Sequence, residues 1–154
     1  MFSASSAAGD TPPHVRELAQ FLAVCDGREP AILWPEQDHA RDGRDAAARA
    51  SETRELARLT GLHPSLACHL ADVEGPRCSS AGSPDCLLVQ QTEGAGSFLL
   101  PAGPSGEPPF SCRLRSGEVL YVPPGRGWRA DLTPRARLLL ISLAPGGPYG
   151  HHPV

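Results

Sequence analysis

Hydrophobic residues recur at helical spacing close to the N-terminus. Val15, Leu18 and Leu22 follow one another at intervals of three or four, which gathers them on one face of an α-helix. Thr11-Pro12-Pro13 supplies a capping hydroxyl and prolines that the first turn of a helix accommodates. Asp26-Gly27 supplies residues that commonly end a helix. The pattern therefore predicts a first helix between these two signals.

Residues 46–60 form a second candidate helix, with a thinner hydrophobic face. They are rich in Ala, Arg, Glu and Leu, which favour helices, and Leu56 and Leu59 face the same side. Residues 31–34, an apolar run stopped by a proline, predict a short strand. Residues 64–70 predict a further short helix.

From about residue 85 the pattern changes to short apolar runs that are typical of β-strands. Phe110, Cys112 and Leu114 alternate with polar residues, as they do on a strand with one buried face. Turn-forming residues separate such runs at intervals that fit an antiparallel sandwich or barrel. Strands are expected at residues 86–90, 97–100, 110–115, 118–122, 127–132 and 137–143.

The sequence therefore predicts a mainly β protein with N-terminal helices. Its 154 residues suit a single domain. We expect a helical region at residues 1–75 that packs on a barrel, a β-barrel core at residues 76–144 and a flexible tail at residues 145–154. Residues 74–84 are rich in Gly, Pro and Ser, and they predict a loop that leads into the barrel.

Charge and composition exclude several functions. The net charge of −3 disfavours nucleic acid as a partner. Residues 1–100 hold 8 Arg and 14 acidic residues, a net of −6, whereas residues 101–154 hold 6 Arg and 3 acidic residues, a net of +3. The basic part suits an anionic ligand or an acidic partner, or else provides solvated strand faces. The sequence has no lysine, so a Schiff-base lysine is excluded, and its Arg, Ala, Gly and Pro content indicates a GC-rich bacterial genome.

The five cysteines do not form a recognisable site. None lies in a Cys-x-x-Cys pair, so zinc-finger and thioredoxin-like sites are not expected. In a reducing compartment they act as small hydrophobic residues. The N-terminus lacks the features of a signal peptide, and no apolar run reaches the roughly 20 residues that span a bilayer. We therefore expect a cytoplasmic protein without a membrane partner.

Two segments of the β region carry a resemblance to a known family. Residues 116–128 read Ser-Gly-Glu-Val-Leu-Tyr-Val-Pro-Pro-Gly-Arg-Gly-Trp, and residues 85–94 read Asp-Cys-Leu-Leu-Val-Gln-Gln-Thr-Glu-Gly. The first segment resembles the strand and turn of the second signature of cupin and JmjC-like barrels. The second resembles the strand Asp-Val-Phe-Ile-Val-Gln-x-Glu-Gly of the JmjC-like branch, which includes the ribosomal oxygenases. The resemblance implies a cupin-like double-stranded β-helix, or jelly-roll barrel.

Active members of that family are iron(II)- and 2-oxoglutarate-dependent oxygenases, whose metal binds two His and one carboxylate. Other residues stand at the positions that the resemblance assigns to these groups. Ala81 and Ser83 replace the first His and the acid, and Trp128 replaces the second His. Gly96 replaces the basic residue that binds 2-oxoglutarate. The resemblance therefore implies a barrel that has lost its metal ligands, and no cofactor is expected.

A metal site would require displaced ligands. No histidine lies between Leu70 and Gly150. His63 and His69 lie just before the barrel, but their separation of six is not the spacing that puts two ligands on one helical face. Together with an acid such as Asp72, they are the metal site that we retain as an alternative.

Six residues are candidates for a ligand pocket in the barrel: Trp128, Arg126, Tyr121, Arg113, Gln91 and Glu118. Trp128 is expected to point inward with Arg126, where it either plugs the barrel or lines a ligand pocket; the third alternative is a surface interface. Arg113 faces either the cavity, where it would bind a carboxylate or phosphate, or water. Tyr121 and Glu118 are candidates for acid–base chemistry, and either Gln90 or Gln91 must face inward.

These residues leave three functions open. The first is a metal-free binding or accessory protein in bacterial specialised metabolism, with a small molecule, a peptide or a sister biosynthetic enzyme as its partner. The second is a metal-independent cyclase or isomerase, and the third is an oxygenase with displaced ligands. The sequence does not decide whether the protein is an enzyme. A homodimer is expected in preference to a monomer.

Overall fold

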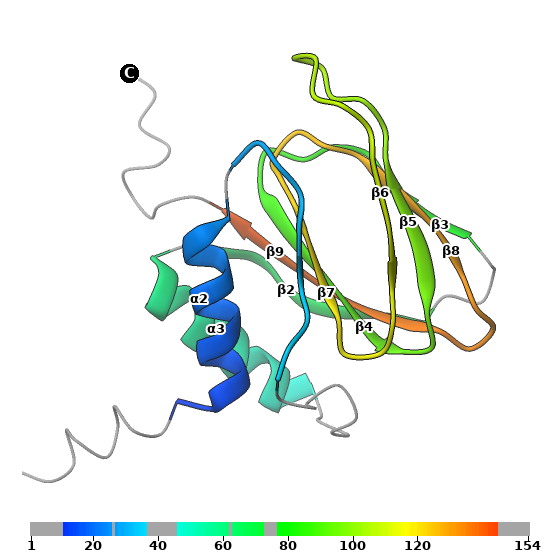
Figure 1. Ribbon diagram of the computed structural model, residues 1–154. Coiled ribbons are helices and arrows are strands. Elements are labelled where there is room, and N and C mark those ends of the chain that lie inside the picture. Colours follow the sequence, from blue (N-terminus) through cyan, green and yellow to red (C-terminus); the bar gives the residue numbers. More distant parts are fainter. Residues whose placement is uncertain (1–10, 26, 37–45, 62, 73–76, 145–154) are drawn as a thin grey trace, which may run out of the picture.

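Figure 1 shows the computed structural model, in which helices lie on one side of a β barrel. The structure describes residues 11–25, 27–36, 46–61, 63–72 and 77–144. The helices are α2 (Pro13–Val24) and α3 (Ala46–Thr60). The strands are β1 (Ala31–Leu33), β2 (His63–Asp72), β3 (Arg77–Ser80), β4 (Cys86–Glu93), β5 (Gly96–Leu100), β6 (Phe110–Leu114), β7 (Val119–Val122), β8 (Trp128–Leu132) and β9 (Arg137–Ala144). The tail predicted at residues 145–154 lies outside the described residues.

Both long predicted helices are confirmed. α2 starts with a proline, whose missing N–H costs no hydrogen bond in a first turn. Val15 and Leu18 are buried as their spacing predicts, and Phe21 completes the buried face. α3 buries Leu56 but leaves Leu59 39% exposed, in agreement with its thin hydrophobic face. Within the described part of the chain, neither helix is long and apolar enough to cross a membrane.

Eight strands form nested antiparallel pairs. β5 pairs with β6, β4 with β7, β3 with β8 and β2 with β9. The chain therefore runs as one long hairpin that is wound into two sheets, which is the arrangement of a double-stranded β-helix, or jelly roll. The sheet orders are β1-β7-β4-β9-β2 and β3-β8-β5-β6. The predicted mainly β fold with N-terminal helices is confirmed.

The barrel begins earlier in the chain than the sequence suggested. The helix predicted at residues 64–70 is wrong, because these residues lie in β2 and pair with β9. Pairing with the leucine-rich strand β9 outweighs the weak helical preference of residues 64–70. Residues 77–80, predicted as loop, form β3 beside β8, and β1 joins the edge of the larger sheet through β7. The region before residue 76 therefore supplies sheet strands as well as helices.

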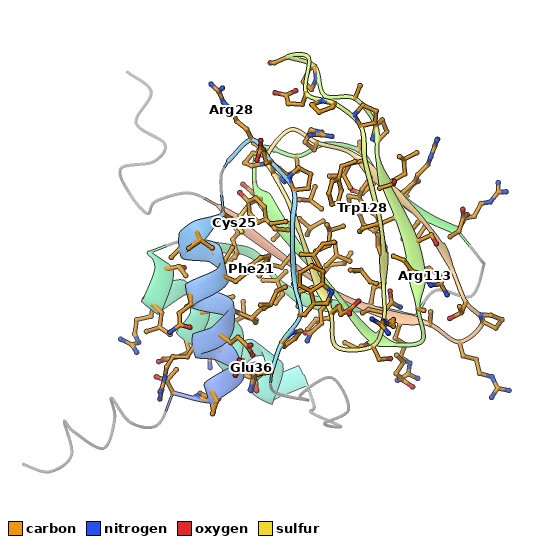
Figure 2. The ribbon with its side chains drawn as sticks, in the orientation of Figure 1. Phe21, Cys25, Arg28, Glu36, Arg113 and Trp128 are labelled. Atoms are coloured by element: carbon orange, nitrogen blue, oxygen red, sulfur yellow. The ribbon has the colours of Figure 1, made fainter. Side chains whose placement is uncertain are left out.

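Two hydrophobic cores hold the layers together. The first lies between the helices and the outer face of the five-stranded sheet, and it includes Phe21, Leu56 and Leu88. The second lies between the two sheets and includes Val89 and Trp128. Leu88 and Val89 are neighbours in β4 and point to opposite sides, as strand geometry requires. Figure 2 shows Phe21 on α2 and Trp128 within the barrel.

Candidate functional site

A cavity of about 220 Å³ opens at one end of the barrel, where β3 leads into β4 and β7 leads into β8. Leu87, Val122 and Leu140 form an apolar wall. The polar groups of the lining come from Ser80, Ser83, Asp85, Arg126, Trp128 and Ser142. Drug-sized ligands occupy sites of roughly 300–1,000 Å³, so this cavity suits a more compact molecule.

The cavity brings together the positions at which the resemblance expects metal ligands. Ala81, Ser83 and Trp128 all line it. The two loops that carry them are in contact, because the N–H of Gly125 donates to the carbonyl oxygen of Ser83 at 2.6 Å. Gly125 has φ +82°, a conformation that glycine adopts without strain. The turn after β7 thus fixes the place of Trp128 relative to residues 81–83.

Trp128 belongs both to the cavity wall and to the inner core. Its side chain is 3% exposed at the start of β8. Its ring centroid lies 5.8 Å from that of Phe98, with the planes tilted by 36°, a stabilising arrangement for two aromatic rings. The predicted inward orientation is confirmed, and the surface alternative is wrong (Figure 2). The indole Nε1–H is buried and has no hydrogen-bond partner among the described residues.

Arg126 is a buried cation at the same end of the barrel, with 5% exposure. Its Nη2 donates to the carbonyl oxygens of Pro101 at 3.0 Å and Pro108 at 3.2 Å, so it ties the β5–β6 connection to the barrel. Its Nε–H is buried without a partner in the described part of the chain. The ion pairs between described residues do not include Arg126. It also borders a second hollow of about 500 Å³, between residues 28–30 and 105–110.

Asp85 supplies the carboxylate of the cavity lining. The hydroxyl of Ser142 donates to its Oδ2 at 3.4 Å, and the residue is partly exposed. Sequence reasoning missed both residues as site candidates. The available signals were the acidic start of the segment at residues 85–94 and a polar residue within the apolar run at residues 137–143.

Two predicted pocket residues do not enter the barrel interior. Tyr121 is 5% exposed and packs between the helices and the sheet, because Leu120 and Val122 take the inward positions of β7. Arg113 is exposed on the outer face of β6, where its Nη1 donates to the hydroxyl of Ser97 at 3.3 Å. Neither side chain therefore lines the cavity, and the side chain of Arg113 faces water.

Gln91 and Glu118 lie at the opposite end of the barrel from the cavity. Gln91 is fully buried, and its Nε2 donates to the carbonyl oxygen of Glu93 at 2.9 Å. Its Oε1 has no partner among the described residues. Glu118 accepts the N–H of Arg115 at 2.8 Å and closes the turn before β7. Both side chains therefore form hydrogen bonds within this end of the barrel and do not line the cavity.

The cysteines offer no activated thiol among those that the structure describes. Burial raises the pKa of Cys25, Cys86 and Cys112 to about 11, and it raises the pKa of Cys78. These thiols are therefore protonated at neutral pH and are poor nucleophiles. Their state agrees with the expectation of small hydrophobic residues.

The residues at the cavity do not fit the iron site of the resembling family. Ala81 has no donor atom, and the indole nitrogen of Trp128 donates a proton and offers no lone pair. Among the described side chains, no group of three potential metal ligands occurs. The backbones of His63 and His69 lie on β2, and their side chains lie outside the described part of the structure.

No protein-family model matches the sequence, and no curated protein matches it. Solved structures do match. Salicylate 1,2-dioxygenase from Pseudoaminobacter salicylatoxidans matches 51% of this chain and 20% of its own, with 19% identity and a TM-score of 0.42. The 3,4-ketoisomerase QdtA from Thermoanaerobacterium thermosaccharolyticum matches 56% of this chain and 64% of its own, with 12% identity and a TM-score of 0.44. The 7S globulin of Momordica charantia matches 58% of this chain and 26% of its own, with 24% identity and a TM-score of 0.41.

This chain thus spans between 20% and 64% of the length of these three proteins. At such identities a likeness concerns the fold alone. The fold assignment rests on the strand pairing within this chain, in which β5–β6, β4–β7, β3–β8 and β2–β9 are nested. That pairing is the pattern of a cupin-type jelly roll.

Proposed function

We propose that this protein binds a small organic molecule, without a metal, in the cavity beside Trp128. One observation carries the proposal: the buried Trp128 Nε1–H and Arg126 Nε–H lack partners among the described residues, and both side chains line one cavity. A buried donor without a partner costs about 1–3 kcal/mol. Neither nitrogen is reachable from solvent in this structure, so a bound acceptor recovers that cost once a small side-chain shift opens the N–H to the cavity. An apolar wall with a few polar groups at a barrel mouth is also typical of small-molecule sites.

The proposed role is that of a binding or accessory protein in bacterial metabolism. It is supported by the residues at the places of the family's metal ligands, Ala81, Ser83 and Trp128, which leave a hollow lined by donors in place of a metal site. In this proposal the barrel is kept as a rigid scaffold, and the site serves an organic ligand.

Native mass spectrometry tests the proposal. The purified chain is incubated with a defined mixture of small carboxylic acids, sugars, amines and nucleosides, and its metal content is measured in parallel. We expect one small molecule per chain and no stoichiometric metal. Stoichiometric iron would contradict the proposal and favour the alternative with displaced ligands at His63 and His69.

A matched pair of variants locates the site. Ala81 lies at the exposed rim of the cavity, so Ala81→Leu fills the hollow without disturbing the core. Ala23 is exposed on α2, and Ala23→Leu makes the same change at a residue that does not line the cavity. We expect Ala81→Leu to abolish binding and Ala23→Leu to leave it unchanged. Equal binding by both variants would contradict a site in this cavity.

A second candidate is a metal-independent isomerase or cyclase. Asp85 favours it, because a carboxylate in the lining of the same cavity can accept a proton from a bound substrate. Asp85→Asn would then abolish turnover and preserve binding. A variant that binds and turns over like the parent would exclude this candidate.

A further inference from the structure

We infer that the ligand of this cavity carries a single negative charge, most simply a carboxylate, beside Arg126. This inference rests on the proposed function and names the class of ligand. Arg126 is 5% exposed, and its guanidinium has no ion-pair partner among the described residues. A neutral acceptor would satisfy the Nε–H alone. An anion would also neutralise the buried charge, and the hydrogen bonds between Arg and a carboxylate are short and strong.

Arg126 is held in place before any ligand arrives. Its Nη2 already donates to two carbonyl oxygens, those of Pro101 and Pro108, at the two ends of the β5–β6 connection. A long flexible side chain normally loses rotamer freedom when it binds a ligand. Here that freedom is already restricted, so little of the interaction with an anion is lost to ordering.

Asp85 opposes an anion in the same cavity, and its effect is the weaker of the two. It is partly exposed, and the Ser142 hydroxyl donates to it at 3.4 Å. Water screens exposed charges strongly and buried charges much less. Arg126 is nearly fully buried, so its field dominates the cavity. A second negative charge on the ligand would find no cation among the lining residues.

The apolar wall and the volume of the cavity restrict the uncharged part of the ligand. Leu87, Val122 and Leu140 are apolar, and the cavity measures about 220 Å³. A compact branched aliphatic acid fits this combination of one cation, an apolar wall and a small volume. The inferred class is therefore a small monocarboxylic acid.

Isothermal titration of the full chain with 3-methylbutanoate and 3-methylbutanamide tests the inference. The two probes have the same shape and differ in charge. We expect the acid to bind at least about tenfold more tightly than the amide. Arg126→Gln should remove this preference. Asp85→Asn should strengthen binding of the acid several-fold and leave the amide unchanged. Arg129→Gln is the control, because Arg129 is exposed on the outer face of β8.

Each outcome is decisive. Equal affinity for acid and amide, abolished by Ala81→Leu, overturns the anionic class and leaves binding in the cavity intact. No saturable binding of the acid at millimolar concentration overturns the inference, and the mass spectrometry screen then decides the proposed function separately. If circular dichroism shows that Arg126→Gln does not fold, Asp85→Asn decides: an unchanged affinity for the acid overturns the inference, and a several-fold gain supports it.

Discussion

Replacing Trp128 by alanine tests how much the buried indole stabilises the packing between the two sheets. The side chain is 3% exposed, and its ring lies 5.8 Å from that of Phe98. A buried aromatic side chain hides roughly 150–250 Å² from water, worth about 4–6 kcal/mol at ~25 cal/mol per Å². Truncations of this kind cost about 3–5 kcal/mol. The cavity already leaves part of the ring without contacts, so we expect a loss of about 3 kcal/mol in the free energy of unfolding.

Urea denaturation followed by circular dichroism measures this loss, and Trp34→Ala is the matched control. Trp34 is 65% exposed, so its replacement should change the free energy of unfolding by less than about 0.5 kcal/mol. A cost below about 1 kcal/mol for Trp128→Ala would lie in the range of an ordinary surface change. It would contradict a stabilising role of the indole between the sheets. Equal costs for the two variants would refute it as well.

Two further predictions concern the rest of the barrel. Gly94→Ala should lower the free energy of unfolding by about 2–3 kcal/mol, because Gly94 has φ +74° and a Cβ there would lie 2.7 Å from Thr133 Oγ1. Gly106→Ala, at φ +92° with open space around it, should cost only the backbone strain of about 1 kcal/mol; urea denaturation of both variants measures the difference, and equal losses would contradict this. Burial raises the pKa of Cys86 and Cys112 to about 11, above their value in the unfolded chain. Their contribution to stability is therefore complete below about pH 8.5 and is lost as the pH rises towards 11; urea titrations across this range should show the decline, and a flat profile would contradict it.

Much of the barrel could be predicted because its strands carry local signals. The alternation of Phe110, Cys112 and Leu114 correctly identified the inner face of β6. β2 could not be predicted, since His63–Asp72 shows no clear alternation and its conformation depends on β9, which lies more than sixty residues later in the chain. Pairing between such distant segments leaves little trace in local propensity.

The candidate site was predicted in part for a similar reason. The Pro-Pro-Gly turn placed Trp128 and Arg126 correctly at the barrel mouth. Tyr121 was misplaced because all four residues of β7 are aliphatic or aromatic and buried, so their sequence does not show which of them face inward. Asp85 joins the site through the folded arrangement of the sheets, and its place depends on contacts with β9, such as that with Ser142.

The indole N–H signals of the two tryptophans report directly on ligand binding beside Trp128. In ¹⁵N-labelled protein, Trp34 and Trp128 each give one indole cross-peak, and a Trp34→Phe variant assigns them. Trp128 lines the cavity, whereas Trp34 is 65% exposed and is not part of the lining. On titration with 3-methylbutanoate, we expect the Trp128 peak to shift saturably and the Trp34 peak to stay in place. A Trp128 peak that does not move, or two peaks that move in proportion, would contradict ligand binding beside Trp128.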